Sequence, residues 1–350
     1  MEMKDKKRYI GHLSQIFEVK EYRLSGGRAD GMRAVDVDNG SGLVFTALPD
    51  RCLDIGKISL HGQTLSFLSP CGYVAPPYYD CHGLEWLRSF TAGFLTTCGF
   101  SNIGNPSEDA GEALGAHGRL SSLPAEQFSA RVRDDGTEPP EAVLSGVMRH
   151  AVIFRENLLL TRKIRCRHGE NRITLEDTVE NIGAEPAPLM RLYHFNIGYP
   201  LLDENAELLI PTRSVIPRDS HAETGLDRWN RMETPVPGFR EMCYYHQMRT
   251  DEKGRSAAGV YQPARGVGAV IRYDTATLDR FLEWKMMSAG NYVLGLEPCN
   301  ATLEGRAEAR ADGSLKFLAP GERLHSRFEL QFVSGAQEWE SFRHEIESYR

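Results

Sequence analysis

The sequence predicts an all-β protein, built as an antiparallel β-sandwich with one short helix at its C-terminal end. Many short apolar runs alternate with polar residues and are separated by Gly, Asn and Pro turn signals. Very few segments repeat apolar residues with a helical period. No stretch alternates strand with helix, as a doubly wound nucleotide-binding fold would require. Together these observations favour sheets packed face to face.

In the first third of the chain, residues 32–38 alternate in polarity like a half-buried strand. Asn39-Gly40 is a strong hairpin signal, and a second strand is expected at 43–48. The short-strand pattern continues over 53–60. Residues 70–116 differ, because they are rich in Gly, Pro, Tyr and Cys and show little periodicity. Long irregular passages in compact domains are often binding loops, so this one is a candidate binding region.

From Val143 onward the strand pattern returns, interrupted by a polar and poorly periodic connection over 202–257. The expected strands are 150–155, 158–164, 172–180, 189–197, 259–261, 269–273, 281–287, 292–297 and 324–333. The only substantial helix is expected at 337–348, where Trp339, Phe342 and Ile346 fall at i, i+3 and i+7. Without an internal repeat or a low-complexity linker, residues 1–350 are expected to form a single domain.

Composition narrows the classes of function. The chain is 41% hydrophobic and 25% charged, as in soluble globular proteins. Its net charge of -7 provides no basic field for nucleic acid or an anionic membrane. No apolar run approaches the roughly 18 residues that span a bilayer. The seven cysteines are widely spaced without a Cys-x-x-Cys pair, which predicts reduced thiols in a cytoplasmic protein. The sequence leaves open whether the chain forms a homodimer.

The first candidate for chemistry is His194, near the end of the strand expected at 189–197. The strand is closed by the breakers Gly198 and Pro200, and His194 lies between two aromatic residues. An imidazole that is partly shielded from water there can titrate near neutral pH and exchange protons efficiently. The alternative interpretation is a core histidine bonded to a backbone carbonyl.

Two other motifs carry candidate polar groups. His117 has glycines close by on both sides in Gly115–Arg119, which allows positive φ and close approach of a ligand. Glu297 ends an apolar strand and is followed by Pro298. An ionised carboxylate is costly to bury, so a glutamate at this place needs a reason. The alternatives are a surface loop histidine and a salt-bridge partner.

The order of these motifs, with Leu95-Thr96-Thr97-Cys98-Gly99 and Ala116-His117-Gly118-Arg119, resembles the galactose mutarotase (aldose 1-epimerase) superfamily. The closer resemblance is to an aldose-1-epimerase-like branch of unassigned activity, over about Gly42 to Val333. It implies a large antiparallel β-supersandwich with a sugar site on a concave face. It also implies that His194 is the general acid, that Glu297 is the general base, and that His117 holds the sugar.

The chain departs from the family pattern at three places. The family loop reads Leu-His-Gly-Gly, where this chain has Ala116–Arg119. The family strand reads Asn-His-x-Tyr-x-Asn, where this chain has Tyr193–Asn196. The substrate-binding aspartate of the family has no clear counterpart, and Asp279 is a candidate by position only. The resemblance therefore leaves the identity of the sugar open.

The expected reaction is exchange of sugar anomers by an isomerase. A base removes the proton of the anomeric hydroxyl while an acid protonates the ring oxygen, so the ring opens. After rotation about C1–C2, reclosure reverses the two roles. A carboxylate and an imidazole on opposite sides of the ring suffice, so no cofactor and no metal are expected, and the partner is a small carbohydrate.

Four cations are expected to line the pocket and bind substrate: Arg51, Arg88, Arg119 and Lys285. Arginine binds paired oxygens well, so their number suggests an acidic or phosphorylated sugar. Ion pairs with neighbouring carboxylates are an equally good explanation.

Two other functions remain open. A catalytically silent carbohydrate sensor could keep the fold, although a binder needs neither an acid nor a base. A metal-dependent sugar isomerase could use His117, His194, His246 and Glu297, although their spacing matches no compact metal motif. An anomerisation assay separates the enzyme from the sensor, and a metal assay on purified protein tests the metal-dependent isomerase.

Overall fold

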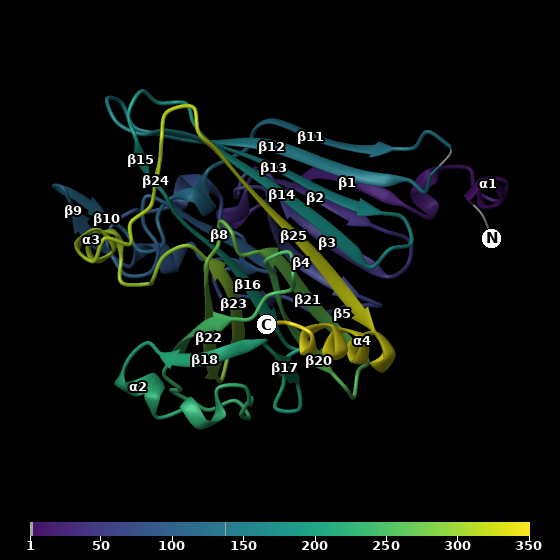
Figure 1. The fold of residues 1–350 in the computed structure, drawn as a ribbon. Helices are drawn as coiled ribbons and strands as arrows, with labels where there is room; N and C mark the ends of the chain where they lie inside the picture. The colour runs from purple at the N-terminus through teal and green to yellow at the C-terminus, as the bar shows by residue number, and fades with distance from the viewer. Residues whose placement is uncertain (1–2, 137) are drawn as a thin grey trace.

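Three large antiparallel sheets form the body of the protein in the computed structural model, which describes residues 3–136 and 138–350 (Figure 1). The five-stranded sheet contains, in spatial order, β1 (Glu18–Arg23), β2 (Arg33–Asp38), β3 (Leu43–Leu48), β4 (Asp54–Leu60) and β5 (Gln63–Thr64). The hairpin expected at Asn39-Gly40 joins β2 to β3.

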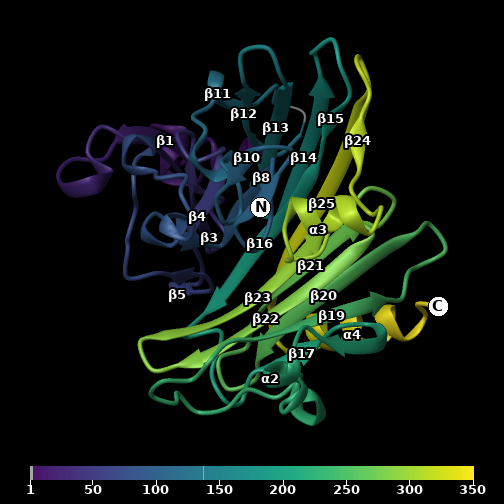
Figure 2. The same ribbon diagram turned by 90° about the vertical axis from the view of Figure 1, so that its left-hand side faces the viewer.

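The eight-stranded sheet has the order β11 (Glu126–Arg133), β12 (Glu141–Ala151), β13 (Asn157–Arg167), β14 (Arg172–Asn181), β25 (Arg323–Ser334), β21 (Val267–Asp274), β20 (Arg255–Gln262) and β17 (Glu207–Leu209). The six-stranded sheet has the order β18 (Thr212–Pro217), β19 (Met242–Met248), β22 (Arg280–Ser288), β23 (Asn291–Cys299), β16 (Met190–Gly198) and β8 (Leu95–Phe100). Figure 2 shows how these long strands cross the molecule. The fold class expected from the sequence is confirmed.

Smaller elements complete the chain. The two-stranded ribbons are β6 (Phe67–Leu68) with β7 (Ala92–Gly93), β9 (Ser107–Asp109) with β10 (Glu112–Leu114), and β15 (Ala187–Pro188) with β24 (Phe317–Leu318). The helices are α1 (Met3–Lys6), α2 (Ser220–Glu223), α3 (Arg306–Ala311) and α4 (Ala336–Glu347). Single 3₁₀ turns lie at η1 (Leu13–Gln15), η2 (Gly27–Ala29), η3 (Pro76–Tyr78), η4 (Glu85–Arg88), η5 (Leu120–Ser122) and η6 (Leu226–Arg228). Within the two described ranges, no helix combines the length and hydrophobicity needed to cross a membrane.

The C-terminal helix lies within one residue of its expected bounds, and Trp339 and Phe342 bury its apolar face. Two passages that were expected to be irregular contain strands. β8 lies within 70–116, while β18 and β19 lie within 202–257. All six residues of β8 are buried, so it lacks the polar alternation by which a half-buried strand is recognised.

The strand β16 positions the site because both of its faces are buried. All nine of its residues are buried, and it pairs with β23 on one side and β8 on the other. Successive side chains of a strand point to opposite faces. Tyr193, Phe195 and Ile197 therefore enter the main hydrophobic core, whereas His194 points to the other face.

A buried polar network fixes β16 from the core side. The guanidinium of Arg162 is fully buried and forms ion pairs with Asp54 at 2.5 Å and with Asp177 at 2.7 Å. The hydroxyl of Tyr193 donates to Asp177 at 2.7 Å. The network joins strands of all three large sheets directly behind the face that carries His194. Breaking such a buried pair leaves an uncompensated charge, which is strongly destabilising.

Candidate functional site

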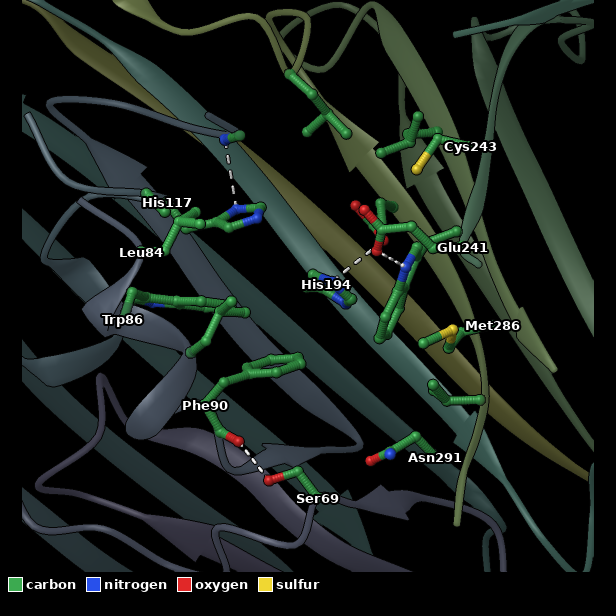
Figure 3. Close-up of a pocket in the computed structure, with 18 of the residues that line it drawn as sticks. Ser69, Leu84, Trp86, Phe90, His117, His194, Glu241, Cys243, Met286 and Asn291 are labelled. Carbon is green, nitrogen blue, oxygen red and sulfur yellow. Dashed lines mark hydrogen bonds and ion pairs between the residues drawn. The ribbon is translucent and has the colours of Figure 1, made fainter. Parts of the chain in front are cut away.

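A pocket of about 320 Å³ lies on the face of the six-stranded sheet opposite the main core (Figure 3). Its floor comes from β16, β22 and β23, and one wall comes from residues 84–90. His117 reaches the pocket from the loop after β10. The three residues singled out from the sequence, His117, His194 and Glu297, all line it.

His194 and Glu297 form a cross-strand pair on the floor. The register that joins Leu192 to Cys299 and Phe195 to Leu296 places His194 directly opposite Glu297. Side chains at such positions are neighbours on one face of a sheet. Their Nε2 and Oε1 atoms are 3.3 Å apart. The two groups therefore lie side by side rather than on opposite sides of a sugar ring.

The pair keeps unused hydrogen-bonding capacity. His194 Nδ1 and Glu297 Oε1 are buried, and neither has a hydrogen-bond partner among the described residues. Buried polar atoms are usually satisfied, so two orphaned atoms at a pocket floor suggest a place for ligand hydroxyls.

Gly295 supplies the space that the pair occupies. A Cβ at this position would lie 2.4 Å from Glu297 Oε1 and 3.0 Å from the Cβ of Trp284. It would also lie 3.3 Å from His194 Cε1. The Gly-Leu-Glu-Pro motif therefore leaves room beside its own carboxylate.

The protonation of the pair follows from its burial. Burial raises the pKa of Glu297 well above its usual value, and the nearby Glu241 raises it further. Burial lowers the pKa of His194 well below its usual value, and His117 lowers it further. Both shifts favour the uncharged forms of the pair, a protonated Glu297 and a neutral His194.

The loop that carries His117 is held in an unusual backbone shape. His117 has φ 55°, in the left-handed region that non-glycine residues seldom adopt. Gly118 follows at φ 67°, and a Cβ there would lie 2.5 Å from the carbonyl oxygen of Gly99. The glycine beside this histidine is thus required by close packing on β8.

His117 is an uncharged group at the edge of the pocket. Burial, aided by the positive charge of Arg218, lowers its pKa to about 4. The backbone N–H of Gly104 approaches its Nδ1 at 3.5 Å. The ring of Trp86 packs against it with centroids 4.5 Å apart. Because Nδ1 is the acceptor toward Gly104, Nε2 carries the proton of the neutral imidazole and can donate to a sugar hydroxyl.

Aromatic rings surround the floor. Phe90 and Trp284 lie 5.2 Å from the ring of His194, measured between centroids. Trp86 stacks on Phe90 at 4.4 Å. The indole N–H of Trp284 donates to Glu241 at 2.7 Å. Figure 3 shows Trp86 and Phe90 on one side of His194, with Glu241 and Met286 on the other.

Two charged residues of the pocket were not anticipated from the sequence. Arg218 directly follows β18, and Glu241 directly precedes β19. Both lie in the passage interpreted as a polar connection. Recognising the short strand Met242–Met248 in the sequence could have found them, because Glu241 directly precedes it. In this strand Met242 and Tyr244 are buried on one face and Cys243 faces the pocket.

The three arginines expected to bind substrate lie outside the pocket lining. Arg51 is buried and donates to the carbonyl oxygens of Val74 and Ser89, so it braces the chain leading to the pocket wall. The Arg88 side chain is 76% exposed and pairs with Glu85 at 2.7 Å. Arg119 is exposed and absent from the pocket lining. The expectation of a cation-rich pocket is wrong in this respect.

The other two expected binding residues also lie elsewhere. Asp279 forms an ion pair with Lys316 and is half exposed. Lys285 follows Trp284 on β22 and so points to the opposite face. Its ammonium group donates to the carbonyl oxygens of Arg228 and Arg231, and pairs with Glu233 at 2.8 Å. Of the described carboxylates, Glu241 is better placed than Asp279 to contact a ligand.

Of the four residues weighed as metal ligands, His117, His194 and Glu297 line one pocket, whereas His246 lies apart from them. His246 lies on the opposite face of the sheet from His194 and contacts Glu283 at 3.1 Å. In the described parts of the chain, the one group of three ligand-type side chains close enough to hold a metal is Asp80, Cys81 and His82, of which Cys81 is half-buried and the other two are exposed. These three residues are absent from the pocket lining.

Comparisons with known proteins agree with this fold. The sequence model described as Domain of unknown function (DUF4432) matches residues 29–332. A comparison with curated proteins found no match. Many of the solved structures that resemble the chain are aldose 1-epimerase or galactose mutarotase-like proteins.

Three solved structures illustrate the similarity. A candidate aldose 1-epimerase from Klebsiella pneumoniae is 26% identical, with a TM-score of 0.88 over 94% of this chain and 87% of that one. A galactose mutarotase-like protein from Clostridium acetobutylicum is 13% identical, with a TM-score of 0.63 over 91% and 99%. A galactose 1-epimerase from Lactobacillus acidophilus is 12% identical, with a TM-score of 0.58 over 91% and 100%. The last two show the fold alone.

Proposed function

We propose that this chain, which belongs to the family described as Domain of unknown function (DUF4432), is an isomerase that interconverts the anomers of an aldose or a related sugar. The observation that carries the proposal is the contact between His194 and Glu297 on the pocket floor, 3.3 Å apart. The names of the similar structures, which include aldose and galactose 1-epimerases, support a sugar substrate.

In the proposed reaction, Glu297 is the general base and His194 is the general acid. Before the sugar reacts, burial favours the protonated form of Glu297 and the neutral form of His194. Transfer of that proton from Glu297 to His194, across the 3.3 Å contact, creates the carboxylate and the imidazolium together. Glu297 then takes the proton of the anomeric hydroxyl while His194 gives its proton to the ring oxygen. The C1–O5 bond breaks and C1 becomes an aldehyde. After rotation about C1–C2, the reverse transfers close the ring.

The side-by-side arrangement suits this chemistry. The anomeric hydroxyl and the ring oxygen are attached to the same carbon, so two neighbouring groups can reach both. The acid and the base need no third reactant, because the proton taken by one is balanced by the proton given by the other. A positioned acid or base typically contributes roughly 10²–10⁴-fold to a rate.

The pocket walls support a sugar as the ligand. The rings of Phe90 and Trp284, which line the pocket, suit the apolar C–H face of a pyranose or furanose ring. His117 supplies a neutral N–H donor at the edge, and we assign to it the binding of a sugar hydroxyl. The cysteines are free in the described structure, which supports the proposal that the protein works in a reducing compartment such as the cytoplasm.

The proposal is tested by measuring anomer exchange by NMR, with a panel of aldoses at equilibrium and the purified protein. We expect faster exchange for at least one aldose, and loss of the acceleration in the Glu297→Gln variant. Binding of a sugar without any acceleration would instead support a carbohydrate sensor. Acceleration that disappears with a chelator and returns with a metal would support the metal-dependent isomerase.

A further inference from the structure

We infer that Arg218 determines which sugars the pocket accepts, and that Glu304 restricts it to uncharged hydroxyl groups by occupying one edge of its guanidinium. This inference rests on the proposed sugar site and adds to it a substrate class and two residues that select it.

Arg218 is held in a defined orientation at the pocket. Its backbone N–H donates to the carbonyl oxygen of Cys243, and its side chain is 17% exposed. Its Nε donates to Glu304 Oε1 at 3.0 Å. The other oxygen of Glu304 accepts from the Asn105 side chain at 3.4 Å, and Asn105 also lines the pocket. Glu304 therefore ties Arg218 to the loop next to His117.

Besides Glu304, the guanidinium of Arg218 lies beside the side chain of Cys243, whose sulfur is a weak acceptor. The two terminal amino groups of Arg218 have no oxygen acceptor within hydrogen-bond distance among the described residues. They form a planar fork of donors with fixed spacing. Such a fork can bind two oxygens on neighbouring carbons, which every aldose with vicinal hydroxyls offers.

The charges around the fork oppose an anionic group. In the described lining, Arg218 is the sole Arg or Lys, while Glu241 and Glu297 are both present. The charge of Arg218 is already balanced by Glu304. A substrate carboxylate or phosphate would lose its hydration without meeting an unpaired cation, which is unfavourable. The arrangement thus accepts hydroxyl oxygens and rejects anions.

The experiment is calorimetric titration of the wild type with matched sugars: D-glucose, D-galactose and D-xylose against D-glucuronate, D-galacturonate and D-glucose 6-phosphate. The variants are Arg218→Gln, Arg218→Lys and Glu304→Gln. Glu308→Gln is the matched control, because Glu308 is exposed and close in sequence but outside the pocket lining. Circular dichroism checks that each variant is folded, and anomer exchange is measured on the same samples.

We expect the wild type to bind at least one neutral sugar and to bind its anionic counterpart roughly tenfold more weakly or not at all. Glu304→Gln should reduce the ratio of the Kd for the anionic sugar to the Kd for the neutral sugar by roughly tenfold or more. The reason is that the variant frees the guanidinium to pair with an anion. Arg218→Gln should weaken binding of the neutral sugar by roughly tenfold, and Arg218→Lys should not restore it because an ammonium lacks the fork. Glu308→Gln should change neither value.

The inference is overturned if the wild type prefers an anionic sugar, if no neutral sugar binds, or if Glu304→Gln leaves the ratio unchanged. It is also overturned if Arg218→Lys binds the neutral sugar as tightly as the wild type. Neutral-sugar selectivity without accelerated anomer exchange would contradict the proposed isomerase while leaving the selectivity inference intact.

Discussion

The six-stranded sheet carries two buried His–Glu pairs, one on each face, and they differ in what surrounds them. Each of the four residues has one buried polar atom without a hydrogen-bond partner in the described structure, but only His194 and Glu297 belong to the lining of the pocket. His246 and Glu283 face the core, where their side chains are fully buried and hydrogen-bonded at 3.1 Å. Trp229 covers His246, with ring centroids 5.0 Å apart.

The difference shows that a buried histidine next to a glutamate is not enough to form a catalytic site. The pair on the core side is enclosed by the segment that Lys285 anchors through two carbonyl oxygens and Glu233. The pair on the pocket side has a cavity above it and Gly295 beside it. We therefore assign a structural role to the first pair and chemistry to the second, and each of the following experiments tests that division.

The largest expected effect is loss of turnover in Glu297→Gln and His194→Ala. Each should lower kcat by roughly 10²–10⁴-fold, because each removes one of the two proton-transfer groups. Glu297→Gln keeps the size of the side chain, so the loss should appear in kcat more than in KM. The measurement is anomer exchange on a sugar that the wild type turns over.

Because acid and base act in one step, the double variant should lose less than the product of the two single losses. Unfolding curves provide the control, since both variants should remain folded. Full activity of Glu297→Gln would remove its assignment as general base.

A large effect on stability, rather than on turnover, is expected for Lys285→Met. The substitution removes one of the two cations paired with Glu233, since Arg228 also pairs with it, and removes the donor to two carbonyl oxygens, so unfolding should cost about 1.5–3 kcal/mol less. Urea unfolding measures this change. The kcat of the folded fraction should equal that of the wild type, and a raised KM with unchanged stability would instead place Lys285 in the site.

An intermediate effect is expected for Gly295→Ala, since the new methyl group would lie 2.4 Å from Glu297 Oε1. The displaced carboxylate should lower kcat by roughly 10–100-fold. Gly259→Ala is the matched control, because its Cβ would meet Phe342 at 2.8 Å, far from the pocket. That variant should lose about 1–3 kcal/mol of stability with unchanged kcat. Equal kinetic losses in both variants would refute the special role of Gly295.

A smaller kinetic effect is expected for His117→Ala. The residue binds a hydroxyl in the proposal and transfers no proton, so KM should rise by roughly tenfold while kcat changes much less. Steady-state exchange rates at several sugar concentrations separate the two parameters. A loss confined to kcat would make His117 a participant in proton transfer.

The smallest effect concerns the dependence of stability on pH. The pKa of His117 is about 4 in the folded protein, below the usual value of 6.5. Between pH 6.5 and 4 the unfolded chain therefore binds a proton that the folded chain does not, so the free energy of unfolding falls as pH falls through this window. His194 acts in the same direction.

The raised pKa of Glu297 acts in the opposite direction, because the folded state loses stability as pH rises above about 4.5, the usual pKa of a glutamate. Comparing the wild type with His117→Asn isolates the histidine contribution. The variant should show a shallower fall in stability between pH 6.5 and 4, and identical slopes would contradict the burial of a neutral His117.

The fold could be predicted because turn residues and alternation mark most strands directly. His194 and Glu297 could be found for the same reason, since each ends an apolar strand where an unpaired polar group is costly. Lys285 could have been placed correctly from alternation alone. If Trp284 faces the pocket, the next residue must face the core.

The rest depended on contacts that sequence order does not reveal. Arg51 resembles a binding residue in sequence, yet its partners are two carbonyl oxygens 23 and 38 positions away. Arg218 and Glu304 are 86 positions apart, and no local pattern marks them as a pair. The expectation that residues 202–257 form one irregular connection also hid the strands that bring Arg218 and Glu241 to the pocket.

The placement of His194 and Glu297 on two inner strands has a consequence for how this protein could diversify. The two residues proposed to transfer protons lie on β16 and β23, whose movement would disturb the core, whereas His117, Arg218 and residues 84–90 come from connecting segments. Mutations in those segments can reshape the entrance while the floor stays intact. Laboratory selection for a new sugar should therefore collect its substitutions in the loops and leave β16 and β23 unchanged.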